Sequence, residues 1–109
     1  MAILEFDEFD WDDQNAGHLE RHQVTTAEAE EAILNRPVSL GSQLRNGEKR
    51  IAMVGQTDTG RVLVVVATMR DKKVRVVTAW PANKNYRGYF SSMRRSGNAG
   101  RIEEQDLRE

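Results

Sequence analysis

The sequence predicts a single α+β domain, in which an antiparallel β-sheet meander is covered by N-terminal helices and a C-terminal helix. Runs rich in Val and Ile occupy residues 49–56, 61–68 and 73–80, and such residues favour strands. The connections between these runs are too short for a crossover helix, so neighbouring strands run antiparallel. Segments with helical spacing and capping residues lie before and after the runs.

The N-terminal segment predicts a short edge strand followed by a first helix. Apolar and acidic residues interleave from Ile3 to Trp11, which suits an extended segment. Asp12 and Asp13 can start a helix that continues to His22, because acidic side chains are favourable in a first turn. His18 and His22 would share one face of this helix. The stretch HLERH lacks the glutamate placement of the HExxH zinc motif and no third ligand is evident, so we expect no metal site.

A second helix is predicted from about residue 25. Thr25 and Glu28 have the spacing of a capping box, the stretch AEAEEAIL is rich in helix formers, and Pro37 ends the helix. A solvated face is the simplest interpretation of the glutamates Glu28, Glu30 and Glu31. The alternative is an acidic patch for a basic partner.

The strand register can be predicted if tight hairpins join the strands. Residues 38–44 predict a short strand or loop, residues 45–47 a turn, and the polar loop 57–60 a hairpin connection. Side chains then alternate between two faces. The predicted core face carries Ile51, Met53, Val62, Val64, Val66, Val74, Val76 and Trp80. The opposite face carries Arg50, Ala52, Val54, Leu63, Val65, Ala67, Arg75, Val77 and Ala79.

This register places Arg50 and Arg75 on either side of Ala67. Two guanidinium groups that converge over a small residue repel each other unless an anion lies between them, and their planar donors suit a phosphate. The pair is therefore the best site candidate that the residues alone provide. The alternative is that both arginines extend to the sheet edge or pair with carboxylates of the N-terminal half.

A final helix is predicted after the last strand, with Asn83 as its cap. Aromatic and apolar residues recur in it at helical spacing beside basic residues, and this combination can stack on nucleic-acid bases. We expect burial for Phe90 and Met93. For Tyr86 and Tyr89, both burial and base stacking stay open.

Length and composition bound the domain organisation. The chain has 109 residues and no cysteine, which excludes a disulfide, a thiolate metal site and a thiol nucleophile. Residues 1–96 form the predicted domain, and residues 97–109 form a predicted flexible polar tail. No apolar run approaches the roughly 20 residues that span a bilayer, and the acidic N-terminus lacks signal-peptide features. The sequence therefore predicts a cytoplasmic protein.

Opposite charges separate along the chain. Residues 1–40 carry ten acidic and two basic side chains, whereas residues 41–95 carry three acidic and twelve basic ones. This asymmetry indicates either an anionic partner for the basic segment or internal neutralisation of the sheet by the acidic helices.

Four stretches together resemble the BrnT family of ribonuclease toxins: FDWDDQN, RHQVT with EAEEAI, GEKRIAMVGQTDTGRVLVVVATMR and KVRVVTAWPANK. The resemblance extends from about Phe9 to Tyr89. It implies a compact α+β fold related to RelE, and cleavage of RNA without a metal or other cofactor. It also implies a bacterial type II toxin-antitoxin module, whose cognate antitoxin often carries its own DNA-binding domain. The oligomeric state stays open, with a homo-oligomer as one option.

The matching positions and the basic C-terminal helix supply the candidate site residues. The catalytic candidates are Glu48, Arg50, Arg75 and His22. The RNA-binding candidates are Arg61, Arg70, Lys84, Arg87 and Tyr89. RNA cleavage without a metal needs a base for the 2′-hydroxyl, cations for the transition-state charge and an acid for the leaving 5′-oxygen. The arginines offer the cations, and Glu48 and His22 are the candidates for base or acid. Substitution of Arg75 by Ala is predicted to abolish cleavage with little change in melting temperature.

Three positions depart from the family pattern, in which an aromatic residue, an arginine and a glutamate are usual at the places of Ala67, Trp80 and Tyr86. Each departure removes a candidate stacking group, phosphate contact or acid-base group. They motivate an alternative hypothesis, a catalytically degenerate BrnT-like protein that binds RNA or its antitoxin. A third alternative is an interaction protein whose charge asymmetry drives self-association or docking to a protein partner.

Overall fold

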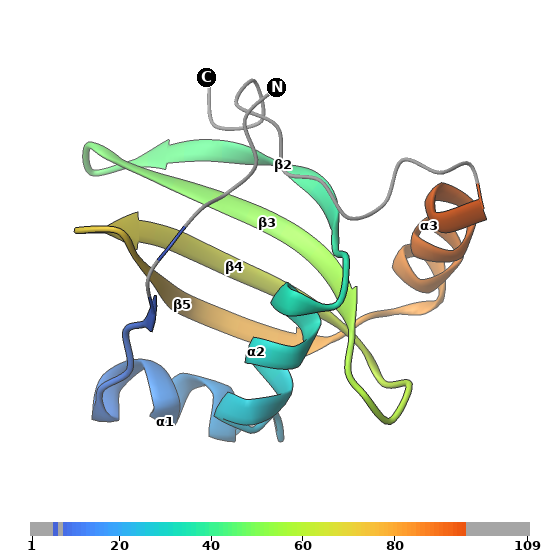
Figure 1. Ribbon diagram of the computed structural model, residues 1–109, viewed down its shortest axis with the longest axis horizontal. Coiled ribbons are helices and arrows are strands. Elements are labelled where there is room, and N and C mark those ends of the chain that lie inside the picture. The colour runs from blue at the N-terminus through green and yellow to red at the C-terminus, as the bar shows by residue number, and fades with distance from the viewer. Residues whose placement is uncertain (1–5, 7, 96–109) are drawn as a thin grey trace.

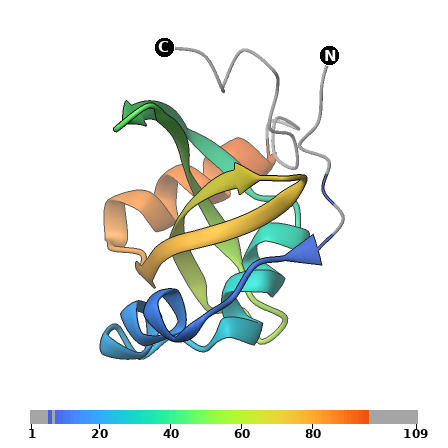
Figure 2. The same cartoon turned by 90° about the vertical axis from the view of Figure 1, so that its left-hand side faces the viewer.

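The computed structural model describes Phe6 and residues 8–95. The elements are β1 (Glu8–Phe9), α1 (Asp13–Arg21), α2 (Thr26–Leu34), β2 (Val38–Arg45), β3 (Glu48–Gln56), β4 (Val62–Arg70), β5 (Lys73–Pro81) and α3 (Lys84–Arg95). All five strands form one sheet in the order β1-β5-β4-β3-β2 (Figure 1). Helices α2 (cyan) and α3 (orange) lie on opposite sides of this sheet (Figure 2).

The predicted α+β class is confirmed, and the sheet is mixed rather than purely antiparallel. Strands β2 to β5 form the predicted antiparallel meander. Within the described residues the N-terminal edge strand comprises Glu8–Phe9 and pairs in parallel with β5, and the start of the predicted segment, at Ile3, lies outside those residues. Residues 38–45 form a full strand. The predicted tail, residues 97–109, lies outside the described residues.

All three helices begin at predicted capping residues. Asp12 accepts hydrogen bonds from the first turn of α1 through its Oδ1 atom. Thr25 and Glu28 form the reciprocal capping box of α2, with both hydrogen bonds at 3.0 Å. The Oδ1 atom of Asn83 accepts a hydrogen bond from the backbone of α3. These caps satisfy backbone N–H groups that have no partner inside a helix.

The prediction of a solvated glutamate face on α2 is wrong. Glu28 accepts hydrogen bonds from the guanidinium of Arg61, and Glu30 accepts one from the indole nitrogen of Trp11 at 2.7 Å. Glu31 accepts one from the backbone of the loop between β3 and β4. Glu28 and Glu31 therefore fasten α2 to the loop between β3 and β4, and Glu30 fastens it to the N-terminal segment.

The pairing of β3 with β4 corrects the predicted faces. Gln56 pairs with Val62, so the connection between the paired ends has an odd number of residues, 57–61. An odd connection moves every side chain of β4 to the face opposite the one expected for a tight hairpin. The side chains that reach the core beneath α1 and α2 are therefore Leu63, Val65 and Ala67. Those that point to the other face are Val62, Val64 and Val66.

A β-bulge corrects the predicted face of the end of β5. The pairing of β4 with β5 shifts between Val66 and Ala67, which leaves Val77 as an extra residue in β5. Beyond a bulge the alternation of side chains reverses. Ala79 therefore joins the core on the side of α1 and α2, and Trp80 lies on the side of α3.

Two hydrophobic cores form on the two sides of the sheet. The larger core, on the side of α1 and α2, contains Leu19, Val24, Ala29, Ala32, Ile33, Ile51, Met53, Leu63, Val65, Ala67, Val74, Val76 and Ala79. The smaller core, beneath α3, contains Val38, Val54, Val64, Ala82 and Phe90, with Met93 packed against it. The predicted burial of Phe90 is thus confirmed, and Met93 is partly buried. Helix α3 covers one end of its side of the sheet, and no other helix of the described residues covers the rest of that side (Figure 1).

Gly55 marks the closest approach of α2 to the sheet, and it generates a stability prediction. A Cβ atom at Gly55 would collide with the backbone carbonyl of Ala32. We expect Gly55→Ala to lower the free energy of unfolding by about 3 kcal/mol, because the methyl group must push α2 away from β3. Urea unfolding followed by circular dichroism measures this change.

Gly17→Ala is the matched control. A Cβ atom built at Gly17 in α1 would meet no described atom within 4 Å beyond its chain neighbours and the backbone of its own helix. We expect this substitution to raise the free energy of unfolding by about 0.5–1 kcal/mol through helix propensity. A Gly55→Ala variant as stable as the wild type would contradict the close packing.

Candidate functional site

The side of the sheet that carries α3, here called the open face, orders its side chains in rows across the strands. Val54 lies beneath α3, so alternation along β3 places Ala52, Arg50 and Glu48 on the same face. A charged row contains Arg45, Glu48, Arg70, Lys73 and Glu8. An arginine row contains Gln43, Arg50, Thr68, Arg75 and Asp10. A small row contains Gly41, Ala52, Val66 and Thr78.

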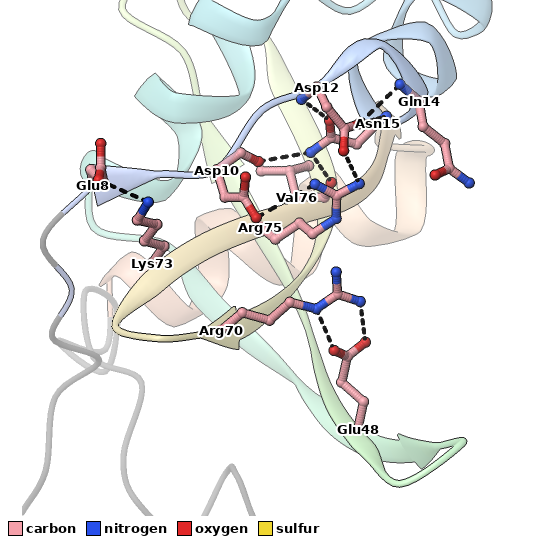
Figure 3. Close-up of polar contacts among 10 residues, drawn as sticks. All are labelled: Glu8, Asp10, Asp12, Gln14, Asn15, Glu48, Arg70, Lys73, Arg75 and Val76. Carbon is pink, nitrogen blue, oxygen red and sulfur yellow. Dashed lines mark hydrogen bonds and ion pairs between the residues drawn. The ribbon is translucent and has the colours of Figure 1, made fainter.

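Arg75 is held by carboxylates of the N-terminal segment. Its side chain is only 11% exposed, with Nη2 2.9 Å from Oδ2 of Asp12 and Nη1 3.5 Å from Oδ2 of Asp10 (Figure 3). The hydrogen bond from the backbone of Asn15, followed by that from Arg75, lowers the pKa of Asp12 against an opposing effect of desolvation. Asp12 therefore fixes both the start of α1 and the guanidinium of Arg75.

Asn15 locks this arrangement onto β5. Its side chain is buried, and its Nδ2 donates to the backbone oxygens of Asp10, at 2.9 Å, and Val76, at 3.0 Å. Its Oδ1 accepts from the backbone of Asp12 at 2.7 Å. The sequence reasoning assigned Asn15 no role. Its position three residues after the cap Asp12 is the signal that could have found it.

Glu48 lies between two arginines of the open face. Its carboxylate accepts hydrogen bonds from Nε of Arg70, at 2.7 Å, and from Nη2 of Arg70, at 3.2 Å (Figure 3). Its Oε1 atom is 4.0 Å from Nε of Arg50. The hydrogen bond from Arg70 lowers the pKa of Glu48, the charges of Arg70, Arg50 and Arg75 lower it further, and desolvation opposes them. Glu48 is therefore held ionised.

Arg50 has a buried hydrogen-bond donor that has no acceptor among the described residues. Its Nε atom is buried and has no hydrogen-bond partner within the described part of the chain. The 4.0 Å that separate it from Glu48 exceed hydrogen-bonding distance. An unpaired buried donor is unfavourable, and the penalty is larger for a charged group. An anion bound beside Arg50 would remove this penalty.

The structure brings Arg50 and Arg75 to one face and corrects what lies between them. They flank Thr68, whereas Ala67 is buried on the opposite side of the sheet. Thr68 donates through Oγ1 to the backbone oxygen of Lys49 at 2.6 Å. Two strand spacings place the Cα atoms of the two arginines about 10 Å apart. Arg75 follows the alternative interpretation, since it pairs with N-terminal carboxylates, and Arg50 does not.

A cleft of about 330 Å³ lies beside Arg50 on the open face. Its lining comes from β2, β3, β4 and β5, and consists of Leu40, Gly41, Ser42, Gln43, Arg45, Arg50, Ala52, Val66, Val77 and Thr78. The arginines and Gln43 make one part of the lining polar, and small aliphatic side chains make the rest apolar. The cleft thus joins the end of the arginine row to the small row.

His22 and Arg61 do not join this group. The ring of His22 lies beside Trp80, with 6.4 Å between the ring centroids. Trp80 lies five positions after Arg75 in β5, a distance of about 16 Å along the strand. Arg61 donates to Glu28 at 3.0 Å and to a backbone carbonyl after α1. It therefore binds the side of the molecule that carries α1 and α2.

The predicted residues of α3 lie next to the open face. Lys84 and Arg87 are exposed, and Tyr89 is 42% exposed. Nη1 of Arg87 donates to the backbone oxygen of Ala82 at 2.7 Å, which fastens the start of the helix. Tyr86 is also exposed, at 40%. Both tyrosines are therefore accessible.

The described residues contain no group of three or more His, Cys, Asp or Glu side chains placed to hold a metal ion. None of their helices has the length and apolar character needed to cross a membrane.

Residues 11–85 match the family described as "Ribonuclease toxin, BrnT, of type II toxin-antitoxin system". The chain belongs to the BrnT family. The match runs from the residue before the cap of α1 into the first turn of α3, so it includes β2 to β5. A comparison with curated proteins finds no match. Membership of this BrnT toxin family implies an RNA substrate and an antitoxin partner.

The ionised state of Glu48 generates a prediction for the pH dependence of stability. Its pKa is lowered from 4.5, so the unfolded chain binds more protons than the folded one at acid pH. The stability that Glu48 contributes is therefore complete above about pH 5 and is lost as the pH falls through its folded-state pKa. We expect Glu48→Gln to be less stable than the wild type at pH 7 and to lose stability less steeply below pH 5.

Urea unfolding at a series of pH values measures this slope. Glu20→Gln is the control, since Glu20 is exposed on α1 and forms no ion pair with any described residue. Parallel curves for Glu48→Gln and the wild type would contradict the assigned ion pairs.

Proposed function

We propose that this BrnT-family chain is a ribonuclease toxin that cuts RNA on the open face of its sheet without a metal ion. The observation that carries the proposal is the buried Nε donor of Arg50, which has no hydrogen-bond partner among the described residues. It lies in one row with Arg75 and within 4.0 Å of the Glu48 carboxylate. Cations beside an ionised carboxylate can supply the charge stabilisation and the base that phosphodiester cleavage needs.

The roles follow from the charge state of each group. Arg50 and Arg75 bind the scissile phosphate and stabilise the charge that grows on its oxygens. Glu48 accepts the proton of the 2′-hydroxyl, because it is ionised at neutral pH and lies beside Arg50. The 2′-oxygen then bonds to phosphorus as the 5′-oxygen leaves with a proton from the solvent. The lowered pKa of Glu48 makes it a weak base, so most of the rate enhancement rests on the arginines.

A catalytically degenerate RNA- or antitoxin-binding protein is the second candidate. It is supported by the ion pairs that the guanidinium groups of Arg75 and Arg70 already form with carboxylates. The departure at Ala67 gives it no support, since Ala67 is buried beneath α1 and α2 rather than placed on the open face. Salt-sensitive RNA binding by a folded chain that never cuts RNA would favour this candidate.

The cellular setting belongs to the same proposal. The toxin role supports a bacterial cytoplasmic protein and a cognate antitoxin with its own DNA-binding domain. The antiparallel meander with helices on both sides is compatible with a fold related to RelE. Light scattering of the purified chain decides between a monomer and a homo-oligomer.

Arg50→Ala tests the site most sharply. We expect it to slow cleavage of total RNA by about 100-fold or more, because it removes a charged donor at the transition state. Its melting temperature should stay close to that of the wild type, since the Nε atom makes no hydrogen bond to the described residues. Wild-type cleavage should persist in EDTA, and the exposed Arg21 on α1 supplies the control variant Arg21→Ala.

Undiminished cleavage by Arg50→Ala would contradict the site, and loss of cleavage in EDTA would contradict metal independence. For Arg75→Ala the structure revises the sequence-based prediction. That variant should lose thermal stability as well as cleavage, because it breaks the ion pairs with Asp10 and Asp12.

Two further variants separate the candidates for proton transfer. We expect Glu48→Gln to slow cleavage by about 100-fold or more. His22→Ala should cleave at the wild-type rate, because His22 lies beside Trp80 at the far end of β5. Single-turnover rates measured across a pH series distinguish the two. The reverse ranking would move the proton acceptor to His22.

A further inference from the structure

The small row is a hollow that the backbone itself creates. Its two ends coincide with the two irregularities of the meander, the register shift at Gly41 in β2 and the bulge at Val77 in β5. Bulges bend strands and re-aim side chains. Gly41 has a φ of 123°, which side-chain-bearing residues rarely adopt, so a glycine is needed there. The strands therefore bend on both sides of Ala52 and Val66.

The floor of this hollow is apolar, and no helix within residues 8–95 covers it. Ala52 and Val66 pair with each other across β3 and β4, and both are partly exposed. Neither belongs to the core on either side of the sheet. One row further along, Val54 and Val64 are fully covered beneath α3, at 0% and 2% exposure. The apolar surface thus continues beyond the edge of α3 into the open cleft.

The rim of the cleft is polar and cationic. Gln43 is exposed at the arginine row, and its amide offers both a donor and an acceptor. Thr78 adds a hydroxyl group from β5. Arg45 is exposed and makes no ion pair with the described residues, and Arg50 carries the unpartnered buried Nε. A free phosphate would not use the apolar floor, and an uncharged ring would not use the arginines.

We propose that the cleft is a nucleobase site, in which a base of the bound RNA lies flat on Ala52 and Val66. Its edge faces Gln43 and Thr78, and its phosphate lies on Arg50. The inference rests on the proposed function in that RNA binds the open face. It adds that the small row determines base recognition next to the phosphate, since larger side chains in this row would fill the cleft.

The test measures binding of short nucleic acids that cannot be cut. The probes are fluorescent 2′-deoxy hexanucleotides and a matched hexanucleotide whose sugar-phosphate backbone carries no bases, titrated by fluorescence anisotropy. We expect the wild type to bind at least one base-containing probe about tenfold or more tightly than the abasic probe, because a base that covers Ala52 and Val66 removes apolar surface from water.

Ala52→Leu fills the floor of the cleft. We expect it to abolish the preference for bases while the affinity for the abasic probe, which reports the arginines and the intact fold, stays unchanged. Ala27→Leu, an exposed position on α2 across the sheet, is the matched control and should keep the preference. Gln43→Ala, an exposed position that should not disturb folding, is the second variant and should reduce discrimination among the four bases.

An Ala52→Leu variant that folds and keeps the wild-type preference would overturn the inference. So would a wild type that binds neither probe, or both equally. If Ala52→Leu does not fold, unchanged discrimination by Gln43→Ala overturns it instead. Base-dependent binding by a chain that never cleaves RNA would support the base site and contradict the proposed catalysis, so the two failures are distinguishable.

Discussion

The ion pair between Asp12 and Arg75 joins the helical and sheet halves of this protein. The distance of 2.9 Å between Oδ2 of Asp12 and Nη2 of Arg75 connects the start of α1 to the middle of β5. The same carboxylate caps α1, and the buried Asn15 binds the linking backbone to β5. Asp12 therefore links the start of α1 to the orientation of one arginine of the open face, and Asn15 supports the same position of α1.

The charge asymmetry of the sequence resolves into pairs of this kind. Acidic residues of the N-terminal half pair with Arg75, with Arg61 and with Lys73. Internal neutralisation by the N-terminal half thus accounts for three of the twelve basic side chains of residues 41–95. Arg50 is different, because its neighbour Glu48 forms its hydrogen bonds with another arginine. The proposed RNA site is therefore defined by the cation that the fold leaves incompletely paired, rather than by the total positive charge.

Local features of the fold could be predicted from the sequence, and the pairing of distant segments could not. The caps at Asp12 and Thr25 depend on residues within one helical turn, so spacing alone reveals them. The faces of β4 depend on whether its hairpin connection is odd or even, and composition does not encode this parity. The bulge at Val77 lies inside a run of β-branched residues that reads as a regular strand.

The residues of the candidate site could be predicted from the sequence, but the residues with which they form ion pairs could not. Glu48 and Arg50 lie two residues apart on one strand, so their common face follows from alternation. Arg75 was also correctly predicted to share that face. The predicted faces were wrong only for β4 and for the end of β5, and Arg75 lies before the bulge in β5. Its pairing with Asp12 and Asp10 joins segments more than 60 residues apart, and no local pattern indicates it. The cleft beside Arg50 depends on the two register shifts and was likewise not predicted.

The central claim, that RNA phosphate binds the unpartnered donor of Arg50, is tested most directly by nuclear magnetic resonance of the arginine Nε–Hε groups. A 2′-deoxy hexanucleotide is titrated into labelled protein, and the signals are assigned with Arg50→Lys and Arg61→Lys variants. We expect the Arg50 signal to move downfield as its donor gains a phosphate oxygen. The chemical shift of Arg61, which binds Glu28 of α2, should not change. An unmoved Arg50 signal at saturating oligonucleotide would contradict the account.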